Sequence, residues 1–334
     1  MKIVLAPELS AADAALYDAF VAAAPSGHYS QSRAWGPLAD SGKSVQSAYF
    51  LVSDASGVIG AARVQRARLG PLALPAAAIE RGPVVKSAEI LEQILPLLIA
   101  ELRSRAVARI AVMPYFAGAQ SVVAEDILRQ LRFRSTQKLD GAHVRTLRVD
   151  LENKKSDALF SGGERESLRR KLREAEKAGV VVRRGAASDV ATLHQLHDSM
   201  MLAQGKRKKA PDYFRALSRF VETEETGALF IADREQAPIA ALFVIAHGPL
   251  ATFVIGASTQ TALPFSKMAS AMAEAIRWAH ARGCKTFDLG GIPAPNDADP
   301  KRASIAQFKF DFAKTATVLA REHARWFWIM PPGS

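Results

Sequence analysis

The chain has 334 residues, of which 49% are hydrophobic and 23% charged, and 44 Lys and Arg against 33 Asp and Glu give a net charge of +11. This composition excludes a disordered chain, a collagen and a coiled coil, and the length favours two domains of about 150 residues each. The single cysteine, Cys284, excludes an intrachain disulfide, so we expect a cytoplasmic location.

The sequence predicts neither a secretory signal nor a transmembrane segment. Near the N-terminus, Glu8, Asp13 and Asp18 interrupt the apolar residues, so no signal peptide is expected. Residues 236–266 carry no formal charge and are long enough to cross a bilayer. Prolines interrupt this stretch, and its β-branched and aromatic residues favour two buried strands about a turn.

One order of elements occurs twice along the chain: a strand hairpin, a further strand and loop, a helix and a closing strand. We expect the first copy at 47–64, 79–85, 87–105 and 109–113, and the second at 227–245, 256–266, 267–282 and 286–289. This order is that of the acyltransferase sheet of the GNAT superfamily. The sequence therefore predicts an α+β fold of two tandem GNAT-like domains with a ligand cleft between them.

The two loops that precede the repeated helices do not look like coenzyme A loops. Acyl-CoA transfer uses a glycine-rich loop whose backbone N–H groups bind the pyrophosphate at a helix N-terminus. The first loop has one glycine, Gly82, and a proline without a donor, and the second has no glycine after Gly256. We expect the sheet without the usual phosphate site, and an acyl-CoA-dependent GNAT N-acyltransferase stays as an alternative.

Short motifs spread over nearly the whole chain carry a resemblance to a known family. They are Trp35-Gly36, Arg81-Gly82-Pro83, Pro114-Tyr115, residues 146–151, the basic helix that ends in KAGVVV, Asp212-Tyr213-Phe214, Gly256-Ala257-Ser258, residues 287–292 and Phe308-Lys309. In this order they resemble the FemABX family of non-ribosomal peptidyltransferases, which carry an amino acid from aminoacyl-tRNA onto a cell-wall precursor peptide. The resemblance implies a first GNAT-like domain at 1–145 plus about 315–334, and a second at 146–314.

The sequence departs from the family pattern at two places. Members that act on wall precursors often have a phosphate-binding Lys four positions after the Trp, where this chain has Ala39. An aromatic hydroxyl often precedes the Gly-Ala-Ser motif, where this chain has Phe253 and Ile255. These differences bear on the identity of the acceptor substrate more than on the identity of the aminoacyl donor.

Lys309 and Asp288 are the candidate catalytic residues, with Phe308 beside the lysine. Aminolysis of an aminoacyl ester requires alignment of the amine and stabilisation of the developing oxyanion, for which one cation suffices. Lys309 alternates with Phe308 and Phe310 as in a strand, and the resemblance points to the same lysine; a surface Lys on an edge strand is the alternative. Asp288, at the end of a predicted strand, accepts the amine proton or only hydrogen bonds from the following turn.

Five residues are candidates for substrate binding. Arg81 is suited to a carboxylate or phosphate, or else to a salt bridge across its loop. Tyr115 and Tyr213 offer hydroxyl groups near the ends of predicted elements, or are core residues. Trp35 and Ser258 are added by the motifs that carry the resemblance.

Positive charge is concentrated between residues 154 and 215, which contain 15 Lys and Arg but 8 Asp and Glu. Contact with phosphates, here those of tRNA, is the functional interpretation, and a solvated helix face with a soluble loop is the alternative. The predicted tRNA-binding residues are Arg165, Arg169, Arg170, Arg173, Lys206, Arg207, Lys208 and Lys209. His194, His197 and Asp198 lack a further ligand, so no metal is predicted.

The resemblance implies an aminoacyltransferase that moves an amino acid from aminoacyl-tRNA to an amine of a peptidoglycan-precursor peptide or a related peptide. No cofactor is expected, and a lipid-linked acceptor would bring the protein into peripheral contact with a membrane. A non-catalytic RNA- or peptide-binding module is a further alternative. The sequence leaves open which amino acid is transferred, which acceptor receives it, and the oligomeric state.

Overall fold

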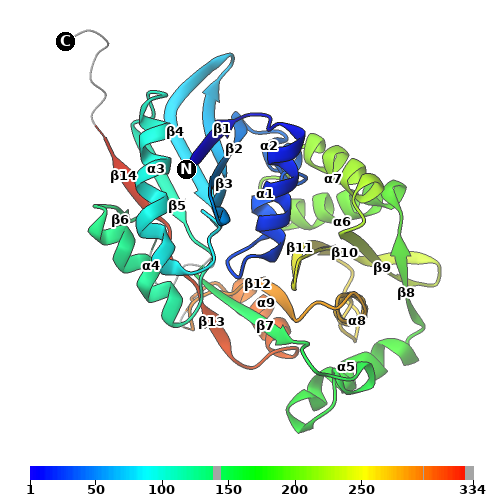
Figure 1. The fold of residues 1–334 in the computed structure, drawn as a ribbon. Coiled ribbons are helices and arrows are strands. Elements are labelled where there is room, and N and C mark those ends of the chain that lie inside the picture. Colours follow the sequence, from blue (N-terminus) through cyan, green and yellow to red (C-terminus); the bar gives the residue numbers. More distant parts are fainter. Residues whose placement is uncertain (138–143, 296, 328–334) are drawn as a thin grey trace. The chain divides into compact units, whose positions relative to one another are not determined.

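The computed structural model describes residues 1–137, 144–295 and 297–327. The chain divides into two compact units, Met1–Arg145 with Thr317–Ser334 (unit 1) and Thr146–Ala316 (unit 2). Each unit is an α+β structure built on a mixed sheet (Figure 1).

The sheet of unit 1 has the strand order β1-β2-β3-β4-β5-β14-β6. Its strands are β1 (Lys2–Ala6), β2 (Val45–Asp54), β3 (Gly57–Leu69), β4 (Leu72–Glu80), β5 (Arg109–Met113), β6 (Arg134–Ser135) and β14 (His323–Trp326). Its helices are α1 (Ala11–Ala23), η1 (Tyr29–Gln31), α2 (Gly36–Asp40), η2 (Ala88–Ile90), α3 (Leu91–Arg103) and α4 (Ala119–Gln130). Strands β4 and β5 are parallel, and the hairpins β2–β3 and β3–β4 are antiparallel.

Apolar spacing explains why α3 forms where it does. Leu91, Leu95, Leu98 and Leu102 recur on one face, and all four are fully buried against the sheet in the main core of unit 1. The predicted strand and loop at 79–85 is wrong in its bounds, because β4 runs from Leu72 to Glu80 and ends where Arg81 takes a positive φ of 56°.

The second sheet has the order β13-β7-β12-β11-β10-β9-β8. Its strands are β7 (Arg145–Asp150), β8 (Val180–Gly185), β9 (Gly227–Arg234), β10 (Ala237–His247), β11 (Leu250–Ser258), β12 (Thr286–Gly291) and β13 (Ala316–Val318). The helices of unit 2 are η3 (Ser156–Ala158), η4 (Gly163–Arg165), α5 (Glu166–Lys177), η5 (Ala187–Asp189), α6 (Val190–Ala203), α7 (Pro211–Thr223), α8 (Ala269–Ala281) and α9 (Pro300–Phe310).

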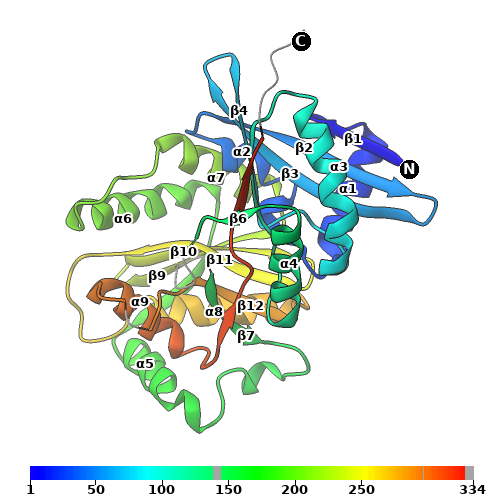
Figure 2. The same cartoon turned by 90° about the vertical axis from the view of Figure 1, so that its left-hand side faces the viewer.

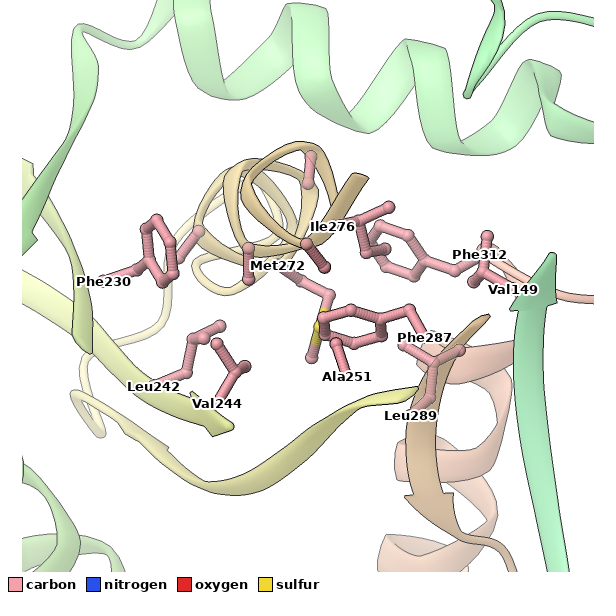
Figure 3. Close-up of a cluster of buried hydrophobic side chains, with 14 of the residues drawn as sticks. Val149, Phe230, Leu242, Val244, Ala251, Met272, Ile276, Phe287, Leu289 and Phe312 are labelled. Carbon is pink, nitrogen blue, oxygen red and sulfur yellow. The ribbon is translucent and has the colours of Figure 1, made fainter. Parts of the chain in front are cut away.

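Helices cover both faces of this sheet. Helix α8 lies on one face and contacts β9 and β10, whereas α6 lies on the other face against β10 and β11 (Figure 2). On the α8 side, Met272 and Ile276 pack against Leu242, Phe287 and Phe312 in the main core of unit 2 (Figure 3). The charge-free stretch 236–266 forms β10, β11 and the loop after them, as expected from its prolines.

The predicted strand around Lys309 is wrong, because Pro300–Phe310 is the helix α9. The carboxylate of Asp299 caps this helix by accepting from the backbone N–H groups of Lys301 and Arg302, and Pro300 occupies its first turn. Phe308 therefore stacks edge-on against Phe312, one turn further along the chain, at 5.4 Å between ring centroids.

Candidate functional site

Lys309 lies in the last turn of α9 with its ammonium group inside unit 2. The side chain is 6% exposed, and Nζ donates to the backbone carbonyl of Gly291 at 2.8 Å. The same Nζ lies 5.9 Å from the ring centroid of Phe253. Burial lowers the pKa of Lys309 to about 8, and the negative charge of Asp288 opposes this shift. At neutral pH the group is still mainly a cation, in a place where water screens it poorly.

Asp288 is positioned by a bulge at the end of β12. The β12–β7 register shifts between Asp288 and Gly291, and Gly290 there has a φ of +78°, which glycine adopts without strain. The Asp288 carboxylate accepts from the Thr146 hydroxyl, from the Gly290 N–H at 2.7 Å and from Arg148 Nε at 3.3 Å. The predicted hydrogen bond from the following turn is thus present, together with partners on β7.

The Asp288→Asn variant is expected to lower the pKa of Lys309 further below 8, because the charge that opposes the effect of burial is removed. The ammonium then deprotonates at lower pH. If this ammonium assists transfer, the alkaline decline of the rate begins at lower pH than in the wild type. A pH–rate profile measures this shift, and an unshifted profile would contradict a role for Asp288 in setting the charge of Lys309.

Three residues that were not predicted as site residues belong to this part of unit 2. Thr146 and Arg148 bind Asp288, as described above. Thr252 pairs with Asp288 across the parallel β11–β12 ladder, and its hydroxyl is buried without a hydrogen-bond partner among the described residues. An unpartnered buried hydroxyl is costly, so a polar ligand atom would compensate for it.

Arg81 belongs to a tightly built loop of unit 1. The next residue, Gly82, begins a cis peptide bond to Pro83. A Cβ at Gly82 would lie 2.6 Å from Cδ of Gln31, a fully buried side chain that donates to the Glu80 carbonyl and accepts from the Arg63 N–H. Any larger residue at this position would force the Gln31 amide out of these two hydrogen bonds, which favours the glycine of the Arg-Gly-Pro sequence.

The structure brings the other unit 1 candidates together with Arg81. The Arg81 guanidinium lies 5.4 Å from the ring centroid of Tyr115, whose ring lies 4.6 Å from that of His28. Tyr29 links His28, at 4.3 Å, to Trp35, at 4.8 Å between centroids. This arginine and aromatic cluster is suited to a ligand that has an anionic group and an apolar or ring-shaped part.

The remaining substrate-binding candidates, Ser258 and Tyr213, both belong to unit 2. Ser258 ends β11, and its carbonyl accepts from the Gln260 amide. Tyr213 lies on α7 beside Phe214, with Nζ of Lys209 at 4.4 Å from its ring centroid. Burial raises the pKa of the Tyr213 hydroxyl.

The predicted tRNA-binding residues form two groups rather than one patch. Helix α5 packs on α8, on one side of the second sheet, whereas residues 206–209 connect α6 and α7, which cover the other side. A segment that is continuous in sequence is therefore divided by the sheet.

The α5 group includes arginines with different local roles. Arg165 donates to the Leu159 carbonyl at 2.6 Å, and Arg169 donates to the Gly162 carbonyl at 2.5 Å, so both brace the preceding loop. Arg169 and Arg173 also line a pocket of about 580 Å³ that Arg277 of α8 completes. Arg170 is exposed and pairs with Glu174 on the same helix.

In the other group, Lys206 and Arg207 are exposed and Lys208 pairs with Asp198 at 3.2 Å.

Unit 1 holds a second cationic groove that the sequence analysis did not identify. It has a volume of about 700 Å³, and the described residues that line it include five arginines and no carboxylate. These arginines are Arg103, Arg109, Arg132, Arg134 and Arg325. They come from separate elements, so the cluster is apparent only after the sheet forms.

Comparisons with known proteins agree with this architecture. A family model described as an acetyltransferase (GNAT) domain matches residues 163–302. The structure titled "Crystal structure of FemX" has a TM-score of 0.81 and 16% identity, over 98% of this chain and 98% of that one. The C-terminal domain of a putative lysylphosphatidylglycerol synthetase from Agrobacterium fabrum has a TM-score of 0.58 and 16% identity, over 94% of this chain and 92% of that one.

A tandem GNAT protein from the clavulanic acid biosynthesis pathway gives a TM-score of 0.57 and 11% identity, over 99% of this chain and all of that one. No curated protein sequence matches the chain.

In the described ranges no helix has the length and apolar character to cross a bilayer, and no cluster of His, Cys, Asp or Glu is arranged to hold a metal ion. The chain has the tandem GNAT-like α+β fold of FemX along nearly its whole length, and this confirms, at the level of the fold, its resemblance to the FemABX family.

Proposed function

We propose that this protein is an aminoacyltransferase that moves an amino acid from aminoacyl-tRNA to an amine of a peptide acceptor, such as a peptidoglycan precursor. The observation that carries the proposal is the buried ammonium group of Lys309. Its one hydrogen-bond acceptor among the described residues is the Gly291 carbonyl, so two N–H donors are left for a ligand. A cation in a poorly screened site stabilises the oxyanion that forms when an amine attacks an ester.

The loops that precede α3 and α8 argue against coenzyme A as the donor carrier. The loop between β11 and α8 contains no glycine, and Nζ of Lys267 donates to the carbonyls of Thr259 and Thr261 inside it. In the corresponding loop of unit 1, Pro83 has no N–H to offer. Pyrophosphate binding at such a helix N-terminus usually relies on a glycine-rich loop that lets the backbone N–H groups approach the phosphates, and neither of these loops is glycine-rich.

The pocket of Arg169, Arg173 and Arg277 is the surface of unit 2 that best fits tRNA phosphates. Arg277 lies over the Phe160 ring at 5.2 Å from its centroid, so a cation and an aromatic ring occur together, as in many sites for single-stranded nucleic acid. The arginine groove of unit 1 is the second candidate surface for the same polyanion.

The Arg173→Gln variant is expected to weaken tRNA binding about threefold at low salt and to reduce the slope of log affinity against log salt by about one unit. Filter binding across a salt series measures both quantities. Arg33→Gln is the matched control, because Arg33 already pairs with Asp18 at 2.8 Å. If Arg173→Gln binds like the control while a variant of Arg132 and Arg134 loses affinity, the groove of unit 1 is the tRNA surface.

Transfer is tested directly by incubating the protein with a mixture of charged tRNAs and candidate peptide amines, and then measuring the masses of the products by mass spectrometry. A peptide that gains one aminoacyl mass, with no product when acetyl-CoA replaces the tRNAs, is the expected result. Product from acetyl-CoA alone would establish the acyl-CoA alternative. Tight tRNA binding with no product from any donor would establish the non-catalytic module.

A further inference from the structure

The turn between β3 and β4 exposes an unusual run of apolar residues. Residues 69–75, with the sequence LGPLALP, are uncharged and all exposed. Leu69 is 67% exposed, Leu72 is 65% exposed and Leu74 is 37% exposed. In both Figure 1 and Figure 2 this hairpin extends beyond the other strands of the first sheet. Single exposed leucines are common on proteins, but several on one projecting turn indicate a surface that binds something apolar.

The hairpin holds this turn in a defined conformation. Leu69 pairs with Leu72 across the ladder, and Gly70 has a positive φ of 58°. Arg68 donates from Nε to the Gly70 carbonyl at 3.3 Å and from a terminal nitrogen to the Pro71 carbonyl at 2.5 Å. The two leucines are therefore presented together before any partner binds, which reduces the entropy lost on binding.

Cations follow directly behind the apolar turn. Residues 62–79 contain three arginines and no Asp or Glu; Arg63 is buried, whereas Arg66 and Arg68 are partly exposed. Arg66 donates to the carbonyl of Arg105, and burial together with the nearby charges of Arg105 and Arg68 lowers the pKa of Arg66. An anion placed beside this group would relieve the repulsion between the arginines.

We propose that the β3–β4 turn is a membrane-docking element that inserts Leu69 and Leu72 into the surface of an anionic phospholipid bilayer. Interfacial segments bury their apolar side about 5–10 Å deep, while Lys and Arg stay at the level of the phosphates. A strand rises about 3.3 Å per residue, so Arg66, three residues before Leu69, stands at the depth of the headgroups when the turn is inserted. A second copy of the chain fits this surface poorly, because it would bring the same arginines against one another.

This docking element adds a partner to the function proposed above without depending on it. Vesicle binding is measured with the protein alone, so its failure would leave the transfer reaction untested and its success would not establish transfer. A protein docked in this way would meet a lipid-linked peptide at the membrane surface.

The test uses a fluorescent label at the turn. The single native cysteine, Cys284, is 5% exposed, so a cysteine introduced as Leu72→Cys is labelled selectively with an environment-sensitive dye. Leu202→Cys is the matched control, since Leu202 is 73% exposed on α6. We expect vesicles of phosphatidylglycerol and phosphatidylcholine to shift the Leu72→Cys emission to shorter wavelength, and brominated lipid chains to quench it, with no change in the control.

Two unlabelled variants separate the apolar from the electrostatic contribution. The Leu69→Ser/Leu72→Ser variant is expected to lose about tenfold or more in vesicle affinity with an unchanged melting temperature, because both side chains are exposed. Arg66→Gln is expected to lose about fivefold for anionic vesicles, and binding should weaken with salt. Wild-type vesicle affinity in the serine variant, or a Leu72→Cys shift that follows protein concentration without vesicles, overturns the proposal; the latter result would identify a second copy as the partner.

Discussion

Replacing Lys309 with Met is expected to reduce the rate of acyl transfer by about 100- to 1,000-fold, the usual effect of removing one oxyanion-stabilising donor. Methionine keeps the length and apolar stem of the side chain but lacks the ammonium N–H groups, one of which donates to the Gly291 carbonyl. The rate of product formation from charged tRNA, with saturating acceptor, measures the effect. Unchanged tRNA affinity in the same variant assigns the loss to the reaction rather than to donor binding.

Two controls distinguish this chemical role from a structural one. Lys309→Arg keeps a cation, so we expect partial activity and loss of the alkaline decline near pH 8.

The pH dependence of stability is the second control. In the wild type, the pKa of Lys309 in the folded protein, about 8, lies below the ordinary value of 10.5, so the buried charge destabilises the fold below pH 8. That penalty is relieved between pH 8 and 10.5, and the relief should be absent in Lys309→Met. Transfer by Lys309→Met at the wild-type rate would remove Lys309 from the mechanism.

Replacing Gly82 with Ala is expected to destabilise unit 1 by about 1–3 kcal/mol, the typical cost of overpacking. The new Cβ would lie 2.6 Å from both Cδ and Oε1 of Gln31, and 2.9 Å from its Nε2. Gln31 has little freedom to move, because its amide links the Glu80 carbonyl and the Arg63 N–H. Chemical denaturation measures the free energy of unfolding.

The matched control for this substitution is Gly163→Ala. A Cβ at Gly163 meets no atom within 4 Å, so only a small change in stability is expected. Arg81 is next to Gly82, so Gly82→Ala should also weaken binding of any ligand held by Arg81 and Tyr115. Equal stabilities of the two alanine variants would show that the Arg81 loop adjusts easily and does not hold Arg81 in place.

Much of the fold could be predicted from the sequence because its main patterns are local. The leucine spacing of α3 and the alternating hairpins β2–β3 and β9–β10 reveal their structure within a few residues. The repeat of these patterns then indicates two similar sheets. For α9, alternation in Gln-Phe-Lys-Phe suggested a strand, although the Asp299-Pro300 pair was a local helix-start signal that could have corrected it.

The candidate site was harder to predict from the sequence, because its contacts join residues far apart in the chain. Asp288 meets Thr146 and Arg148 only through the register of β12 against β7, about which neither segment carries a local signal. Likewise, the basic segment looks continuous in sequence, but the sheet separates α5 from residues 206–209. Arg277 completes the α5 pocket from another helix, so residue type alone could not identify it.

The return of the chain to unit 1 affects the order in which the protein is made. Strand β14 lies between β5 and β6 and pairs with both, and Arg321 forms a bidentate ion pair with the buried Glu125 of α4. During translation, every residue of unit 2 leaves the ribosome before β14 does. Until the second unit has been synthesised, the edge of β5 that β14 covers therefore stays unpaired, and β6, the two-residue edge strand that pairs with β14, has no strand to pair with. A nascent chain that stops at residue 316 exposes this edge of β5.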